Sequence, residues 1–451
     1  MVSRLEAILP RTFSIGFAVA WTIWKLLAAL TSPLVSWDGM VYWLNGLSYL
    51  QGRSPVYEFF RPPVLPLFLG LTQALGFGLW TSVIWHPIVT GASGLMLFLV
   101  LRSFVREWLA SVSTVIFLMT SVVQYWSVTI LTHGFATLLL LAGTYFIIRP
   151  TFKNELVGAA LLSIIWRRRR ITDLDAVLVG GVLPVSPFLL SQPSLVLDTV
   201  HEIFGAEILG QKSVFVASSS IVATSPAFYL SWLIGNFQLL TILLAIGLFA
   251  AIKIRNSLVF ALWFMPYFVG FSILSNRQDR FVFELAPAIA ALVVIGAEYT
   301  MRRTSRTKMV SLGLLLLVGL FVVNQTVTTV SQPAIGYQLN DTQLSTSYQI
   351  IGQAIEAHTN STDVVLAENN VPWLSYYSSR YVYLSRTAQV TSGLALQSYV
   401  QQFHPTPNLL VAMPFYGSNM ALLNSLPYLS LVEVVGTPAL GDAYLFRVSL
   451  P

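Results

Sequence analysis

The chain has 451 residues, of which 55% are hydrophobic and only 10% are charged, and its formal net charge is +6. Ordinary globular domains contain about 25% charged residues, so this composition argues against a soluble protein and indicates a polytopic α-helical membrane protein. Lys and Arg fall in short clusters between apolar runs, a pattern typical of cytoplasmic loops and not of a nucleic-acid-binding surface. The sequence has no cysteine, which excludes disulfide bonds and cysteine-ligated metal sites.

The apolar runs are close to 20 residues long, enough to cross about 30 Å of hydrocarbon as helices. The first run, Phe13–Leu30, follows Arg4 and Arg11, which place the N-terminus in the cytoplasm, and no small-residue cleavage site follows it. We therefore expect a retained first span and about nine spans in total. The other spans are expected at about Thr81–Leu101, Trp108–Trp126, Val128–Ile148, Leu174–Leu190, Phe228–Ile252, Ser257–Leu274, Phe281–Tyr299 and Met309–Val323.

Two apolar segments are too short to span. Val64–Phe77 suits a helix lying in the membrane interface. Glu155–Trp166 is followed by four arginines at positions 167–170, which predicts a cytoplasmic, re-entrant or interfacial segment whose arginines contact anionic lipid.

The alternation of spans places everything after about Asn324 outside the cell. Asn-x-Thr sequons at Asn324, Asn340 and Asn360 agree with this side, or arise by chance in a Thr-rich stretch. Composition divides the chain into a transmembrane domain, 1–327, with its first outer loop at 31–80, and an extracytoplasmic α/β domain, 328–451.

Short strands and helices alternate in this tail. The tail contains no glycine-rich phosphate loop and no nucleophile elbow, so we interpret it as a lid or an acceptor-recognition domain. Strands are expected at Asp363–Glu368, Tyr381–Leu384, Leu409–Met413, Leu431–Val435 and Ala443–Val448, and helices at Tyr348–Ala357 and Leu394–Gln402.

The first outer loop contains SWDGMVYWLNGLSYLQGRSPVYEFFRPPVLP, Ser36–Pro66. Asp38 is a carboxylate among apolar and aromatic residues, which is costly at a membrane surface unless the group is used. Tyr57, Glu58 and Arg61 follow before three prolines, and we expect them to bind substrate. Alternatively, Asp38 caps a helix that begins there, and Glu58 with Arg61 forms a surface ion pair.

Other polar residues are expected on the same outer face. They are His133 at the outer end of its span, His201 and Glu202 in a long loop, and Arg277 and Arg280 in the short loop SNRQDR. Their convergence from distant parts of the sequence predicts a substrate site. Each also has a simpler explanation: a helix–helix hydrogen bond for His133, a solvated loop for His201 and Glu202, and a charged turn in which Arg280 pairs with Glu284 four residues later.

Four stretches together resemble the GT-C superfamily of membrane glycosyltransferases. They are WDGMVYW…RPPVLP in the first loop, LTHGFATLLLLAGTYFIIRP at Leu131–Pro150, SPAFYLSWLIG before a span, and RQDRFVFELAPAIAAL at Arg277–Leu292. The resemblance is strongest to the branch containing dolichyl-phosphate-mannose–protein mannosyltransferases and the aminoarabinose transferase of lipid A, and a trailing outer α/β domain suits prokaryotic members, particularly archaeal ones.

This resemblance implies a polyprenyl-phosphate-linked sugar as donor and an inverting transfer, on the outer face, to a hydroxyl of a glycan, lipid or protein. It implies that Asp38 deprotonates or positions the acceptor hydroxyl, in some relatives with a divalent metal that Asp38 and His133 would bind here. It also implies that Arg280, with Arg277, holds the donor phosphate.

The sequence departs from this family at two places. His133 stands where many relatives carry a second acidic residue, and a helical hairpin is missing near residues 163–167. A non-catalytic polytopic protein with the same scaffold, acting in binding or assembly, is therefore the alternative. A transporter ranks third, because no pair of broken spans repeats in the two halves of the chain.

Overall fold

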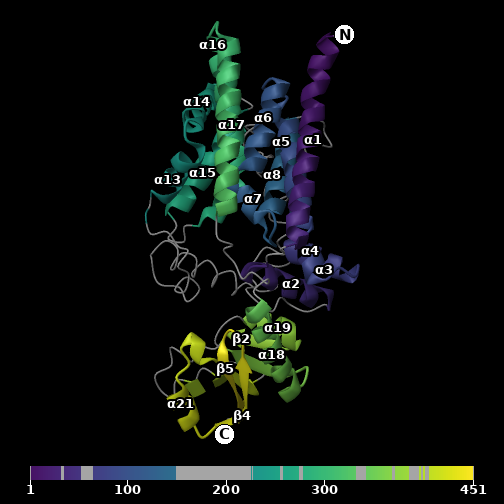
Figure 1. The fold of residues 1–451 in the computed structure, drawn as a ribbon, viewed down its shortest axis with the longest axis vertical. Coiled ribbons are helices and arrows are strands. Elements are labelled where there is room, and N and C mark those ends of the chain that lie inside the picture. The colour runs from purple at the N-terminus through teal and green to yellow at the C-terminus, as the bar shows by residue number, and fades with distance from the viewer. Residues whose placement is uncertain are drawn as a thin grey trace, which may run out of the picture. The chain divides into compact units, whose positions relative to one another are not determined.

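The computed structural model describes residues 2–31, 35–51, 64–148, 227–253, 257–273, 278–331, 342–367, 371–384 and 406–449, together with residues 225, 396–397 and 400–401. Contacts divide the chain into two compact units (Figure 1). The helical unit comprises Met1–Thr31 and Val83–Pro333, and the sheet unit comprises Ser32–Ser82 and Ala334–Pro451. The short segment Glu155–Trp166, the span expected at 174–190 and the missing hairpin lie outside the described residues.

The helical unit consists of apolar helices around one central helix, α16 (Val282–Arg303). In α16, 89% of the apolar stretch is buried, against 28% in α1 and 22% in α17, so α16 is surrounded by protein while the other two expose most of their surface. The remaining elements are α1 (Val2–Thr31), α5 (Trp85–Leu101), α6 (Glu107–Met119), α7 (Ser121–Trp126), α8 (His133–Ile148), α13 (Phe228–Phe237), α14 (Leu240–Lys253), α15 (Leu258–Ile273), the 3₁₀ turn η3 (Asp279–Phe281) and α17 (Thr307–Ser331).

Within the described residues, three helices are long and apolar enough to cross a membrane, and a fourth span results if the bent pair α13 and α14 counts as one. Shorter apolar helices, α5, α6 and α15 among them, accompany these in the helical unit. The chain is thus built as a membrane protein, and the count of nine spans stays a prediction.

Two stretches expected as continuous helices are broken. Residues 108–126 form α6 and α7, separated at Thr120, whose backbone is extended (φ −57°, ψ 129°). Residues 228–252 form α13 and α14, which meet at 114° next to Gln238, a non-glycine residue with φ +47°. Neither break contains proline or glycine, so local sequence carried no signal for either.

Helices α14 and α16 pack with their backbones almost in contact. A Cβ atom on Gly296 would collide with the carbonyl oxygen of Leu243 and lie 2.9 Å from the backbone nitrogen of Gly247. A Cβ on Gly247 would collide with the carbonyl oxygen of Leu292. Small residues allow this approach, which is the usual way that helices associate where burial from water gives no driving force.

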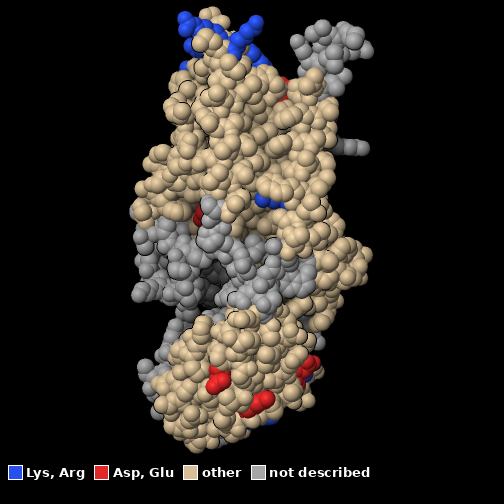
Figure 2. Space-filling model, viewed as in Figure 1, with Lys and Arg blue, Asp and Glu red and all other residues tan. Residues whose placement is uncertain are grey.

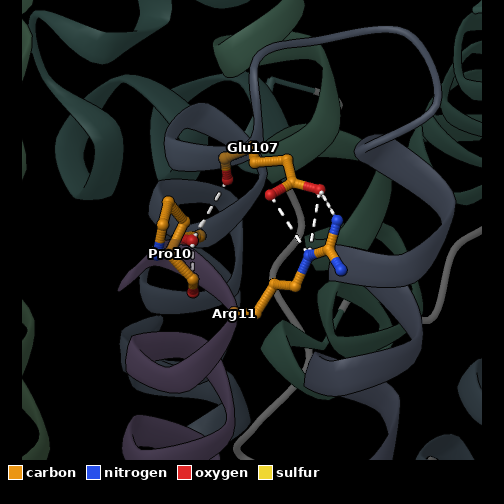
Figure 3. A network of polar contacts seen from close by, with 4 residues as sticks. Pro10, Arg11 and Glu107 are labelled. Atoms are coloured by element: carbon orange, nitrogen blue, oxygen red, sulfur yellow. Dashed lines mark hydrogen bonds and ion pairs between the residues drawn. The ribbon is translucent and has the colours of Figure 1, made fainter. Parts of the chain in front are cut away.

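Two consecutive charged residues stand at the start of helix α6, Arg106 at its N-cap and Glu107 as its first residue, and they bind two different helices. Arg106 Nε lies 3.4 Å from Glu298 Oε2 of α16. Glu107 Oε1 accepts from the Arg11 terminal nitrogen at 2.7 Å, and Ser111 donates to the Pro10 carbonyl at 3.0 Å (Figure 3). This end of α1, α6 and α16 is therefore tied together by ion pairs.

Basic side chains gather at the end of α16 (Figure 2). Arg302 and Arg303 close α16, and Arg306 and Lys308 follow at the start of α17. The cluster is the one from which the sequence predicts the cytoplasmic side, and that orientation stays a prediction.

The sheet unit includes the first-loop helices α2 (Trp37–Leu50), α3 (Val64–Ala74) and α4 (Leu79–Ser82). Helices α2 and α3 cross at Gly46 and Gly70, where a Cβ on either would lie 2.8 Å from a carbonyl oxygen of the other helix. Gln73 of α3 donates to the Trp43 carbonyl of α2 at 3.0 Å. Helix α2 also packs against α19 (Val371–Ser378) of the C-terminal segment.

The sheet has five strands in the order β2-β1-β3-β5-β4. Strand β1 pairs in parallel with β2 and β3, while β5 runs antiparallel to β3 and β4. All residues of β1 and β3 are buried, so both faces of the sheet centre are covered. The bounds are α18 (Thr342–His358), β1 (Val364–Ala367), β2 (Tyr381–Leu384), β3 (Leu409–Ala412), η5 (Pro414–Tyr416), α21 (Met420–Ser425), β4 (Leu429–Thr437) and β5 (Gly441–Val448).

The small α/β layer expected from the tail is confirmed, and each of the five expected strands is present. Of the helix expected at Leu394–Gln402, the described residues 396–397 and 400–401 are helical. The sequence did not predict α19 or α21, which are only eight and six residues long.

Candidate functional site

Three of the expected site residues are described. His133 and Arg280 belong to the helical unit, and Asp38 belongs to the sheet unit. The others, Tyr57, Glu58, Arg61, His201, Glu202 and Arg277, lie outside the described residues.

Asp38 is the second residue of α2 and is half-buried. The helix is capped by Ser36, whose side chain accepts from the Gly39 backbone N–H at 3.1 Å. The alternative in which Asp38 itself caps the helix is therefore wrong. A carboxylate in the first turn interacts favourably with the partial positive charge of the helix N-terminus. Asp38 therefore lies at the positive end of α2 without being its cap.

His133 begins α8 and is 8% exposed. Its Nδ1 atom lies 3.0 Å from Oε1 of Glu284, a residue in the first turn of α16. The ring of Phe283 stacks on the imidazole with centroids 6.1 Å apart. A carboxylate accepts a hydrogen bond only from a protonated nitrogen, so Nδ1 is the donor in this pair and Nε2 is the ring nitrogen that Glu284 does not engage.

The simpler explanation of the charged loop paired Arg280 with Glu284 four residues later, and in the structure the Glu284 carboxylate contacts His133. The sequence did indicate that a carboxylate within a span needs a partner. It did not indicate which partner, because 151 residues separate the two side chains.

Arg280 lies in η3, which is held by tertiary contacts on both sides. The Tyr229 hydroxyl donates to the Gln278 carbonyl at 3.1 Å and accepts from the Gln278 N–H at 3.2 Å. Phe271 stacks on Phe281 at 5.2 Å, and the Arg280 guanidinium carbon lies 5.4 Å from the Phe281 ring centre. Arg280 is thus presented from a fixed turn.

Phe281 connects the two parts of this cluster. The His133 ring meets Phe281 edge-on at 6.3 Å, and Arg280 lies against the same ring. The helical unit therefore brings together two expected site residues, Arg280 and His133, with Glu284. Arg280 also interacts electrostatically with the neighbouring Asp279, and a guanidinium in this cluster is suited to bind an anionic, oxygen-rich group such as a phosphate.

Tyr229 is a residue that sequence reasoning missed. It is 1% exposed in the apolar helix α13 and both donates to and accepts from Gln278, the residue directly before η3. The available signal was a tyrosine hydroxyl near the end of an apolar run, which needs a hydrogen-bond partner when it is buried.

A divalent metal would need oxygen or nitrogen ligands from several side chains. Within the described part of the chain, no three His, Asp or Glu residues lie close enough together to hold one.

No family model and no curated protein matches the sequence. Solved structures do match. The crystal structure of ArnT from Cupriavidus metallidurans bound to undecaprenyl phosphate has a TM-score of 0.65 and 13% identity, over 97% of this chain and 99% of that one. Its apo state matches at 0.63 with 12% identity over the same shares.

The cryo-EM structure of the arabinofuranosyltransferase AftD from Mycobacteria matches with a TM-score of 0.54 and 13% identity. The match covers 96% of this chain but only 40% of AftD. ArnT, an aminoarabinose transferase, and AftD are both GT-C membrane glycosyltransferases. At such low identity the likeness shows the fold alone, so this chain shares the fold of ArnT and AftD.

Proposed function

We propose that the chain is an integral membrane glycosyltransferase that moves a sugar from a polyprenyl-phosphate-linked donor to a hydroxyl acceptor on the extracytoplasmic face. The observation that carries the proposal is the match over nearly the full length of both chains to ArnT, which was solved with undecaprenyl phosphate. The Arg280, His133 and Glu284 cluster supports it, because a lipid phosphate needs cationic and hydrogen-bonding partners near the membrane surface.

In the proposed reaction, Asp38 takes the proton of the acceptor hydroxyl as its oxygen attacks the anomeric carbon. The attack comes from the face opposite the phosphate, so the configuration inverts. The bond from the anomeric carbon to the phosphate oxygen breaks, and its electron pair leaves with the polyprenyl phosphate. One carboxylate suffices, because a phosphate leaving group needs electrostatic stabilisation more than a proton.

Arg280 would stabilise the leaving phosphate as its charge grows. Its guanidinium is fixed against Phe281 by a turn that Tyr229 holds, so little reorganisation is needed when charge develops. Arg277 and Arg61 would add positive charge to the same phosphate. Their positions suit this role in the sequence, where Arg277 is three residues before Arg280 and Arg61 precedes two prolines.

The remaining expected residues would bind substrate. His133, oriented by Glu284 through Nδ1, would contact the acceptor or donor through Nε2. Tyr57 and Glu58 of the first loop, and His201 with Glu202 of the later loop, would contact the sugar or acceptor. The C-terminal α/β domain would recognise the acceptor.

The test is sugar transfer in membranes from a set of radiolabelled polyprenyl-phosphate sugars. The natural chain should transfer from at least one donor, and Asp38→Asn should lower the rate by roughly the 10²–10⁴ that positioned proton transfer contributes. Arg280→Lys keeps a charge but loses the planar fork of donors, so it should raise the KM for the donor.

Equal rates for the natural chain and Asp38→Asn would remove Asp38 from the mechanism. No transfer from any donor would favour a non-catalytic protein that uses this scaffold for binding or assembly.

A further inference from the structure

One buried amide joins three helices of the helical unit. Gln325 of α17 is 0% exposed. Its Oε1 accepts from the Ser121 backbone N–H at 2.7 Å, and its Nε2 donates to the Asn236 carbonyl at 3.0 Å. These two backbone groups belong to α7 and α13.

Because of the helix breaks, neither backbone group has a hydrogen-bond partner within its own helix. Ser121 is the first residue of α7, directly after the extended Thr120, so its N–H points out of the end of a helix. Asn236 is in the last turn of α13. In a continuous helix its carbonyl would accept from the Leu240 N–H, but the 114° bend after α13 interrupts this hydrogen bond. Such groups are very costly to leave unpaired in an apolar environment.

A glutamine is the side chain that fits this position. It carries an acceptor and donors on one amide, so it satisfies a free N–H and a free carbonyl together. The neighbouring side chains complete the network. Ser121 Oγ donates to Asn236 Oδ1 at 3.3 Å, and Gln124 Nε2 donates to the Met119 carbonyl at 2.5 Å, on the other side of the Thr120 break.

The two helices that Gln325 holds both contact the Arg280 turn or the residue directly before it. Helix α7 packs against η3. Helix α13 carries Tyr229, which makes two hydrogen bonds to Gln278 directly before η3. A shift of either broken helix would therefore move the turn that presents Arg280.

We infer that Gln325 is a positioning residue for the phosphate-binding turn: it pairs the free backbone groups of two broken helices and so fixes α7 and α13 against η3. The inference rests on the proposed function for the role of Arg280, and on the hydrogen bonds alone for the role of Gln325. It also gives Asn324-Gln325-Thr326 a meaning other than a glycosylation sequon, because all three residues lie inside α17.

The experiment compares the full-length natural chain, Gln325→Met and Asn324→Met, each purified in lipid nanodiscs. Gln325→Met keeps the side-chain length and removes both hydrogen bonds. Asn324→Met makes the same kind of change one residue earlier, at a half-buried side chain. Hydrogen exchange is measured by mass spectrometry over residues 278–284, and kcat and KM are measured for the polyprenyl-phosphate sugar that the natural chain uses.

Gln325→Met should speed amide exchange over residues 278–284 by about tenfold, the change expected when a hydrogen bond with a typical net contribution is lost. It should lower kcat/KM for the donor by about 10- to 100-fold at a temperature where the protein remains folded, because small displacements of a binding group have large effects. Asn324→Met should leave both unchanged.

Unchanged exchange over 278–284 in folded Gln325→Met overturns the inference, whatever the activity. If Gln325→Met does not fold, Gln325→Asn replaces it. That variant keeps an amide but is one methylene shorter, so it cannot reach both Ser121 and Asn236, and exchange should rise over 228–237 and 278–284. No change in either segment would also overturn the inference. If the natural chain transfers no sugar, the proposed function fails, while the exchange result still decides the role of Gln325.

Discussion

His133 Nδ1 lies 3.0 Å from Glu284 Oε1, which makes a hydrogen-bonded pair from the first turns of α8 and α16. Both side chains are mostly buried, with exposed fractions of 10% and 17%, so each depends on the other for its polar contact. Hydrogen bonds in which one group is charged contribute about 1.5–3 kcal/mol to stability.

We expect substitutions at His133 and Glu284 to have non-additive effects on stability and on the donor KM. Glu284→Gln keeps an acceptor but removes the charge, and His133→Phe removes the donor. Because either change alone abolishes the same charged hydrogen bond, the double variant should be no more than slightly worse than His133→Phe. Thermal unfolding and donor KM of the four proteins give the coupling energy, expected at about 0.5–3 kcal/mol for residues in contact. Fully additive effects would show that the two side chains act separately.

Tyr229→Phe should loosen the turn that carries Arg280. The variant keeps the aromatic packing with Phe271 but removes the hydroxyl that bonds both the N–H and the carbonyl of Gln278. The Gln278 carbonyl still accepts from the Phe281 N–H at 3.3 Å, so the loss is that of ordinary hydrogen bonds, about 0.5–1.5 kcal/mol each. We expect a lower unfolding temperature and a raised donor KM.

Tyr299→Phe in the last turns of α16 is the comparison for Tyr229→Phe, since the Tyr299 ring contacts Phe249 and Arg303. Equal effects of both changes on the donor KM would contradict the role given to Tyr229.

Gly296→Ala and Gly319→Ala should change stability in opposite directions. A methyl group on Gly296 collides with the Leu243 carbonyl of α14, whereas Gly319 of α17 has nothing within 4 Å of the added carbon. Overpacking typically costs about 1–3 kcal/mol, while Gly→Ala inside a helix stabilises by about 0.5–1 kcal/mol. Thermal unfolding in one detergent measures both, and a stabilised Gly296→Ala would mean that α14 and α16 move apart easily.

The ion pairs of Glu298 predict that the loss of Glu298 and the loss of Arg302 destabilise the protein to different degrees. Glu298 is 3% exposed and accepts from Arg302 Nε at 2.7 Å, while its other oxygen lies 3.4 Å from Arg106. Removing the carboxylate leaves two arginines that already reach solvent, with exposed fractions of 42% and 58%. Removing Arg302 leaves the buried Glu298 carboxylate with the longer contact to Arg106, at 3.4 Å.

Arg302→Met should therefore destabilise the protein more than Glu298→Gln does, because an unpaired buried charge costs more than a lost surface charge. Unfolding temperatures of the two variants, with exposed Arg303→Met as the control, measure the difference. A larger loss for Glu298→Gln would contradict this assignment.

The sequence by itself determined the class of protein and the layout of the tail. Apolar runs near 20 residues identify a membrane protein, because in lipid only α-helices and closed β-barrels pair all of their backbone N–H and C=O groups. The five strands were predictable because runs such as Val364–Ala367 and Leu409–Ala412 are wholly apolar, β-branched or leucine-rich, and bounded by polar residues. That His133 would contact another polar group was predictable, because a polar side chain at the end of an apolar run requires a partner or a ligand.

Tertiary structure alone decided where the helices break and which residues meet. The bends at Thr120 and Gln238 contain no helix-breaking residue, and they persist because Gln325 pairs the backbone groups that they release. Ser121 and Gln325 are separated by 204 residues, and His133 and Glu284 by 151, so no local pattern links either pair. Local sequence sets which stretches are buried, while hydrogen-bond partners are chosen in three dimensions, because a buried polar group pairs with whatever group packing brings within reach.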